Sequence, residues 1–116
     1  MAYLNRVVSK SILEDEYAAI SDYNKAIKID PQYVKAYYNR ALSKERIGDL
    51  QGSIADYTKV IEINPRDYEA YNNRGIAKKN LNDDYGAISD YIKAIELNRK
   101  SVSYTHLRAH ETSLHL

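Results

Sequence analysis

The chain has 116 residues, 44% of them hydrophobic, and its 17 Lys and Arg against 16 Asp and Glu give a net charge of +1. A near-neutral chain disfavours a surface that follows nucleic-acid phosphates, because such a surface needs clustered Lys and Arg. The absence of cysteine excludes disulfides and thiol chemistry, and no apolar run approaches the roughly 20 residues of a membrane-spanning helix. The first ten residues lack the apolar core of a signal peptide, so the default expectation is a cytoplasmic protein, with the compartment otherwise left open.

The sequence repeats itself with a period of 34 residues. AYLNR, AYYNR and AYNNR begin at positions 2, 36 and 70, and AISDYNKAI, SIADYTKVI and AISDYIKAI begin at positions 19, 53 and 87. Fixed self-similarity at this length predicts stacked supersecondary units that share one continuous core. It also shifts the question of function from a catalytic centre to a surface.

The first repeat predicts two helices that end at Asp30-Pro31, because proline restricts the residue before it and cannot donate to a helix. The turn between the two helices falls at Glu14. Glutamate is a poor residue for a left-handed turn conformation, so we expect this turn to be less sharply specified than the later ones.

The second repeat shows the same unit more clearly. A helix is predicted over 35–47, and Gly48 stands where a helix end favours a left-handed residue. Asp49 is a plausible cap for a second helix over about 50–63, which Pro65 stops. In the third repeat Asn82 replaces the glycine, and asparagine is the best other residue for a positive φ.

The second helices of the three repeats carry matching apolar stripes at helical spacing. Small residues occupy the points where helices must approach one another. If a C-terminal capping helix is missing, Ile88, Ile92 and Ile95 on the last helix are expected to lose part of their cover. The stripes are Ile20, Tyr23 and Ile27; Ile54, Tyr57 and Ile61; and Ile88, Tyr91 and Ile95. The small residues are Ala41 and Gly75 on first helices, and Ala19, Ser53, Ala87, Ala26 and Ala94 on second helices.

These residues resemble the tetratricopeptide repeat family, which pairs two antiparallel helices in every 34 residues. The second repeat holds the pattern as Tyr37, Gly48-Asp49, Ser53, Tyr57, Val60 and Pro65. The third repeat holds it as Tyr71, Asn82-Asp83, Ala87, Tyr91 and Ala94, with Arg99 in place of the proline. The resemblance implies an all-α, right-handed superhelix of three antiparallel helix pairs over 1–98, with repeats at about 1–32, 33–66 and 67–98. Residues 99–116 then form a tail outside the repeats.

In this family the first helices line a concave groove that takes partner peptides, so the resemblance implies a protein-interaction scaffold. An asparagine side chain can satisfy both the N–H and the C=O of an extended peptide, and one asparagine per repeat is expected in the groove. The predicted peptide-binding residues are the ladder Asn5, Asn39 and Asn73, the aliphatic stripe Val8, Leu42 and Ile76, and the flanking Tyr38 and Asn72. The alternative is that the asparagines are merely solvated and the stripe locks neighbouring helices.

Two further functional classes remain as alternatives to peptide binding. One is an RNA-binding helical repeat, which is disfavoured by the near-neutral charge and by the Gly-Asp and Tyr/Pro signature of this chain, because the RNA-reading pentatricopeptide family lacks that signature. The other is a structural segment, or a substrate-recruiting array, of a longer protein.

A carboxylate clamp for the C-terminal tails of the Hsp70 and Hsp90 chaperones is not expected. That clamp uses Lys, Asn and Arg side chains; the positions that would carry it here hold Leu4, Val8, Asn39, Glu69 and Asn73, and of these only Asn39 fits. Without cations a buried carboxylate would stay unpaired.

Two charged ladders share the 34-residue period. Arginine stands at positions 6, 40 and 74, and aspartate at positions 22, 56 and 90. We interpret these ladders as structural pairs between packed helices rather than as a phosphate site, and the sequence leaves open which Arg meets which Asp. The lysines at positions 10, 44 and 78 are expected to form a solvated face.

The segment after residue 98 contains all three histidines and resembles translated sequencing-adaptor read-through, so we expect an artefact or a makeshift cap. His106 and His110 would share one helical face, but two histidines without a third ligand are a weak metal signal. The array has no cysteine, no histidine and no glycine-rich phosphate loop. We therefore predict no metal, cofactor or catalytic site, and neither nucleic acid nor membrane as a partner.

Overall fold

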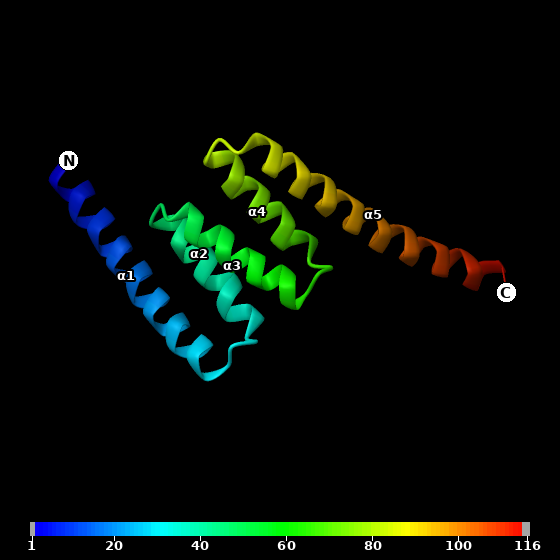
Figure 1. Ribbon diagram of the computed structural model, residues 1–116, viewed down its shortest axis with the longest axis horizontal. Helices are drawn as coiled ribbons and strands as arrows, with labels where there is room; N and C mark the ends of the chain where they lie inside the picture. The colour runs from blue at the N-terminus through cyan, green and yellow to red at the C-terminus, as the bar shows by residue number, and fades with distance from the viewer. Residues whose placement is uncertain (1, 115–116) are drawn as a thin grey trace.

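The computed structural model describes the backbone of residues 2–114 and the side chains of residues 12–101. Over this range the chain forms helices and no strands (Figure 1). The helices are α1 (Ala2–Ile29), α2 (Val34–Arg46), α3 (Leu50–Ile63), α4 (Tyr68–Asn80) and α5 (Asp84–Leu114). The all-α class predicted from the sequence is confirmed.

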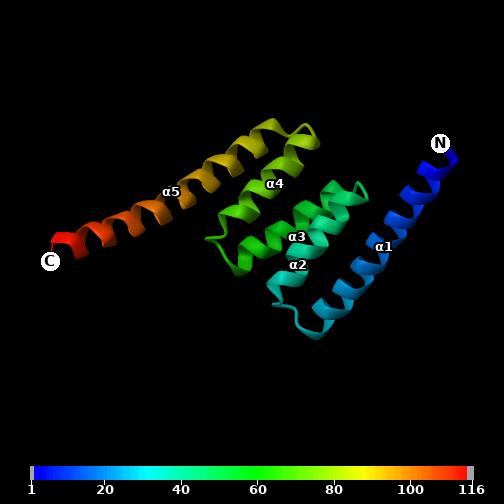
Figure 2. The same cartoon turned by 180° about the vertical axis from the view of Figure 1, so that it is seen from behind.

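The helices stack in chain order. α2 packs on α1 and α3, and α4 packs on α3 and α5. Both views show α2 with α3, and α4 with α5, as antiparallel neighbours, with α1 lying beside the first pair (Figures 1 and 2). Each element therefore touches mainly its neighbours in sequence, as in other repeat solenoids.

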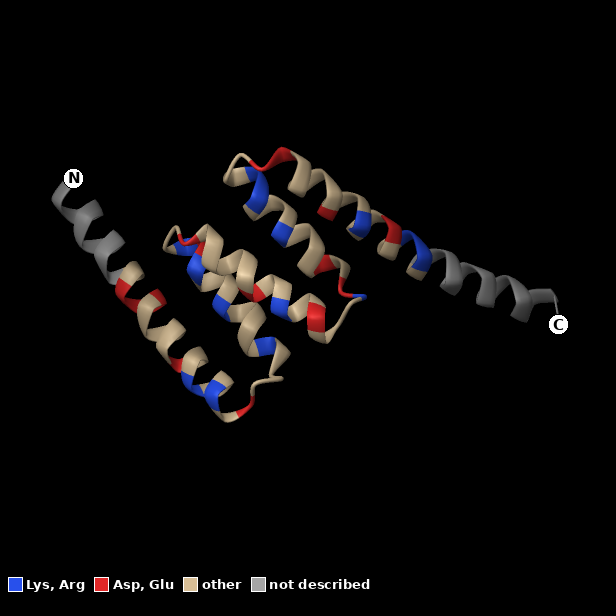
Figure 3. Ribbon diagram, viewed as in Figure 1, with Lys and Arg blue, Asp and Glu red and all other residues tan. Residues whose placement is uncertain are grey.

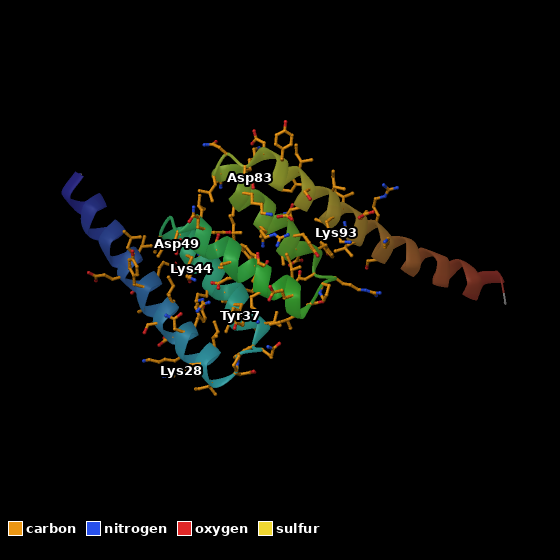
Figure 4. All side chains as sticks on the ribbon, in the orientation of Figure 1. Lys28, Tyr37, Lys44, Asp49, Asp83 and Lys93 are labelled. Carbon is orange, nitrogen blue, oxygen red and sulfur yellow. The ribbon has the colours of Figure 1, made fainter. Side chains whose placement is uncertain are left out.

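The turns inside the second and third repeats follow the sequence prediction. Gly48 has φ 87° and Asn82 has φ 65°, so both take the left-handed conformation that ends a helix. Asp49 and Asp83, labelled at the two turns in Figure 4, then accept the backbone N–H of the residue three positions later at 2.9 Å and 3.0 Å.

The first repeat differs from the prediction, because α1 is one continuous helix of 28 residues rather than a helical hairpin with a turn at Glu14. No glycine or asparagine stands at that position to take a positive φ, so nothing stops helix propagation there. The chain thus has two complete helix pairs preceded by one long helix.

At the end of the third repeat a helix also continues, because the residue that would stop it is missing. α1 and α3 end directly before Asp30-Pro31 and Asn64-Pro65, as predicted, whereas Arg99 stands where the third proline would be. α5 accordingly continues past Asn98 to Leu114. The boundary after residue 98 between array and tail stays a prediction.

Small residues allow the helices to approach closely, as expected. Ala41, Ser53 and Ala70 are completely buried. At Gly75 an added Cβ would lie 2.8 Å from Cε1 of Tyr91, so this site of α4 has no room for a side chain unless the ring moves. By contrast, Ile88, Ile92 and Ile95 on α5 stay exposed, which confirms that this stripe has little cover.

Tyr57 is the largest fully buried side chain in the described core. Its ring packs edge-on against Tyr38, with centroids 5.7 Å apart. Its hydroxyl has no hydrogen-bond partner of good geometry among the described residues, although the Glu45 carboxylate is close enough to act on it. Burial, followed by the negative charge of Glu45, raises the pKa of the Tyr57 hydroxyl.

We expect Tyr57→Phe to leave the free energy of unfolding unchanged or to raise it by up to about 1 kcal/mol, because it removes a buried hydroxyl without a partner. Urea denaturation followed by circular dichroism measures this. As a matched control, Tyr57→Ala should cost roughly 3 kcal/mol or more through the cavity it leaves. A loss above about 1 kcal/mol for Tyr57→Phe would mean that the hydroxyl is paired in solution, with Glu45 as the nearest acceptor.

Candidate functional site

A pocket of about 320 Å³ lies where α2, α4 and α5 meet. Its lining mixes aromatic, amide and aliphatic side chains with one carboxylate. The lining residues are Tyr38 from α2; Tyr68, Glu69, Asn72 and Asn73 from α4; and Ala94, Ile95 and Asn98 from α5. Apolar walls with a few polar groups are typical of sites that take a side chain or a small ligand.

The pocket brings together some of the predicted groove residues but not all of them. Tyr38, Asn72 and Asn73 line it. Asn39 and Leu42 are half-buried on α2, and Ile76 on α4 is exposed; none of these three belongs to the lining. The predictions for Asn5 and Val8 fall outside the described side chains.

A hydrogen bond joins the first helices of two successive repeats at this pocket. The Asn73 side-chain amide donates to the Tyr38 hydroxyl at 2.7 Å. The bond orients Asn73 and leaves its carbonyl oxygen able to accept a peptide N–H. The Asn39 side chain makes no hydrogen bond with another residue whose side chain is described.

The tyrosine at this junction lies in a negative environment. Partial burial is the main reason that the pKa of Tyr38 is raised, and the charges of Glu69 and Asp67 raise it further, while the hydrogen bond from Asn73 lowers it. The carboxylates of Glu69 and Asp67 therefore act on this wall of the pocket.

Five of the eight lining residues were not predicted as site residues from the sequence. Ile95 was assigned only to an apolar stripe, and Ala94 only to helix packing. Tyr68 and Glu69 stand where the preceding repeat has Val34 and Lys35, so the repeat pattern does not mark them. Asn98 matches Asn64 one period earlier, which is a signal that could have been used.

In the second and third repeats the arginine and aspartate ladders form structural pairs, as interpreted from the sequence, whereas Arg6 of the first repeat falls outside the described side chains. Arg40 donates two hydrogen bonds to Asp56, from Nε at 2.9 Å and Nη2 at 2.6 Å. Arg74 does the same to Asp90, at 2.8 Å and 2.7 Å. The aspartate side chains are only 4% exposed, so these bidentate pairs join the two helices of a repeat in the interior.

The lysine face was predicted wrongly. Lys44 Nζ lies 3.2 Å from Asp56, and Lys78 Nζ lies 3.1 Å from Asp90. Each lysine stands four residues after its arginine and so shares its helical face. A single buried carboxylate thus receives two cations. Lys10 falls outside the described side chains.

Each arginine also reaches back to the preceding repeat. Arg40 Nη1 donates to Asn24 at 2.8 Å, and Arg74 Nη1 donates to Thr58 at 3.2 Å. Asn24 and Thr58 are one period apart in sequence, so this contact repeats with the fold. The guanidinium groups therefore serve helix packing rather than an external phosphate.

The described part of the chain holds neither a metal site nor a membrane-spanning helix. No group of three His, Cys, Asp or Glu side chains there could hold a metal ion. None of the described helices is long and apolar enough to cross a membrane. The three histidines of the tail lie outside the described side chains.

Comparison with known families agrees with the repeat architecture. Profiles described as TPR repeat, at residues 17–48, and as tetratricopeptide repeat, at residues 34–67 and 56–88, match the chain. Together they span more than half of it. The chain belongs to the tetratricopeptide repeat family.

Solved structures that resemble this tetratricopeptide repeat array include two crystal structures of MamA, each 30% identical to the chain. One has a TM-score of 0.76 over 78% of this chain and 53% of MamA, and the other a TM-score of 0.72 over 77% and 49%. MamA from Desulfovibrio magneticus RS-1, at 20% identity, has a TM-score of 0.72 over 84% of this chain and 55% of that one, and shows the fold alone. The chain thus spans about half the length of these structures. No curated protein sequence matches it.

We expect Asp90→Asn to lower the free energy of unfolding by roughly 3 kcal/mol at neutral pH, because it leaves Arg74 and Lys78 without their buried counter-charge. Urea denaturation measures the loss, with the exposed Glu96→Gln as a matched control that should change stability by less than about 0.5 kcal/mol. An equal, small effect for both variants would contradict a stabilising pair.

The same aspartate predicts a pH dependence. Burial would raise the pKa of Asp90, but hydrogen bonds and charges from Arg74 and Lys78 outweigh burial and lower it overall. A lowered native pKa gives stability that is complete above the unfolded value of about 3.9 and is lost as the pH falls through the native value. The free energy of unfolding should therefore fall as the pH drops below about 4, and fall less steeply in Asp90→Asn; parallel curves would contradict this.

Proposed function

We propose that this chain is a protein-interaction scaffold that holds an extended peptide of a partner protein along the first helices of its repeats. The observation that carries the proposal is the pocket between α2, α4 and α5, where Tyr38 orients Asn73. An oriented amide beside an apolar wall can bind a peptide backbone and leave room for one of its side chains. Membership of the tetratricopeptide repeat family supports the same function.

The charge distribution favours a protein partner over nucleic acid. Basic and acidic segments are interspersed over the array rather than gathered into a basic stripe (Figure 3). Two of the arginines and two of the lysines are already engaged by Asp56 and Asp90. Binding of RNA that weakens steeply with salt would contradict the proposal.

The expected affinity is modest. A net hydrogen bond contributes about 0.5–1.5 kcal/mol. Two or three asparagines therefore offset only part of an association cost of about 4–15 kcal/mol. We expect dissociation constants in the micromolar range or weaker for a peptide on this array.

We expect Asn73→Ala and Asn39→Ala each to weaken a groove-binding peptide about two- to tenfold, because each removes hydrogen bonds to the peptide backbone. A peptide selected from a displayed library against the chain serves as the probe, and isothermal titration calorimetry measures its affinity. Asn39→Ala should leave the melting temperature nearly unchanged, whereas Asn73→Ala also loses the bond to Tyr38 and should cost about 0.5–1.5 kcal/mol.

The control for this experiment is Asn80→Ala, since Asn80 is exposed at the end of α4 and lines no part of the pocket. It should leave peptide affinity unchanged. If Asn39→Ala lowers stability but not affinity, Asn39 is structural and the asparagine ladder is not a peptide grip. If no library peptide binds, the proposed function fails.

A further inference from the structure

We propose that the pocket between α2, α4 and α5 takes a positively charged side chain, a lysine or arginine of the bound peptide. The inference deepens the proposed function and rests on it. It concerns the chemistry of the one side chain that enters the pocket, whereas the asparagines would hold the backbone.

The charge of the pocket lining is negative. Glu69 is the single charged residue among the lining residues, and no basic residue is among them. Glu69 is exposed and forms no ion pair with any residue whose side chain is described. Its carboxylate is therefore available to a cation from outside, unlike Asp56 and Asp90, which already hold two cations each.

The electrostatic environment extends beyond Glu69 itself. The charged groups that act on the Tyr38 hydroxyl are the carboxylates of Glu69, Asp67 and Glu45, and they raise its pKa together with burial. Asp67 caps α4 by accepting the N–H of Ala70 at 3.1 Å, so its charge is fixed near the same end of the helix. A cation entering here would gain attraction from several carboxylates, and an anion would be repelled.

The aromatic side chains suit a cation as well. Tyr38 and Tyr68 both line the pocket, and tyrosine rings attract ammonium and guanidinium groups that lie over their faces. The aliphatic wall formed by Ala94 and Ile95 would contact the methylene groups of a lysine or arginine, whose charged end could then reach Glu69. A volume of about 320 Å³ is large enough for such a side chain with part of its backbone.

The repeat itself shows that Glu69 is not required for folding. The preceding repeat has Lys35 at the same position, also exposed at the start of a first helix. A position that accepts either sign of charge is not fixed by helix packing. The carboxylate is thus a particular feature of the third repeat, and Glu69→Gln should fold normally.

The test is an NMR titration of the full chain, labelled with ¹⁵N, with three capped pentapeptides of sequence Gly-Ser-Xaa-Ser-Gly. Xaa is lysine, norleucine (an uncharged residue of similar length) or glutamate. The side-chain amides of Asn72, Asn73 and Asn98 report on the pocket, and that of Asn39 reports on the groove beside it. We expect the lysine peptide to shift the pocket signals with at least about threefold higher affinity than the norleucine peptide, and the glutamate peptide to bind most weakly.

Two variants sharpen the result. Glu69→Gln should abolish the preference for lysine over norleucine, and raising the salt concentration should reduce it in the unmodified chain. The matched control Lys35→Gln should leave the preference unchanged. Equal affinities for lysine and norleucine, or a preference that survives Glu69→Gln, would overturn the inference.

The outcomes separate this inference from the proposed function. If all three peptides shift the signals of Asn39 and Asn73 equally, the groove binds peptide backbone and the pocket has no cation preference. If library-selected peptides bind the groove but carry no basic residue whose replacement weakens binding, the inference fails and the scaffold function stands. If no peptide shifts any groove signal even at millimolar concentration, both fail.

Discussion

The buried bidentate pair between an arginine of the first helix and an aspartate of the second is the interaction on which this array depends. Arg40 holds Asp56, and Arg74 holds Asp90 through two hydrogen bonds each, while the third nitrogen of each guanidinium reaches the preceding repeat. Burying a carboxylate costs several kcal/mol unless it is fully compensated, so each pair tolerates little rotation or sliding of the helices. A short-range electrostatic requirement thus fixes the arrangement of three successive helices.

The same pairs orient the asparagines that precede the arginines on the first helices. Asn39 and Asn73 directly precede the two arginines, and successive residues of a helix point about 100° apart. Once the arginine is fixed towards α5, the asparagine before it is turned to another face of α4. There the Tyr38 hydroxyl holds Asn73 at 2.7 Å. The packing of the array and the chemistry of its surface are therefore set by neighbouring residues of one helix.

Much of this could be predicted from the sequence, because the signals are local and repeated. Gly48 and Asn82 indicated turns with a positive φ, and Asp49 indicated a helix N-cap. The Asp-Pro and Asn-Pro pairs indicated where two helices end. The prediction of a helical hairpin in the first repeat was wrong, because the family pattern was carried over to a segment that has Glu14 where a turn residue is needed. The prediction that the lysines form a solvated face was also wrong. Helical spacing places Lys44 on the side of Arg40, but it does not show how deeply the shared carboxylate is buried.

The sequence by itself determined the period, the helical class, the turns and the presence of two charged ladders, because each depends on contacts within a repeat or on backbone preference. Only the tertiary structure decided that Arg40 and Arg74 meet the aspartates of their own repeats, and that each of these two aspartates also holds a lysine. It likewise decided that Tyr38, Glu69 and Ile95 meet in one pocket. The reason is physical: these residues come from three helices, and their meeting depends on helix rotation and separation. Those are set by the buried ion pairs together with the close packing of small residues such as Gly75 against Tyr91, which act between helices rather than within one.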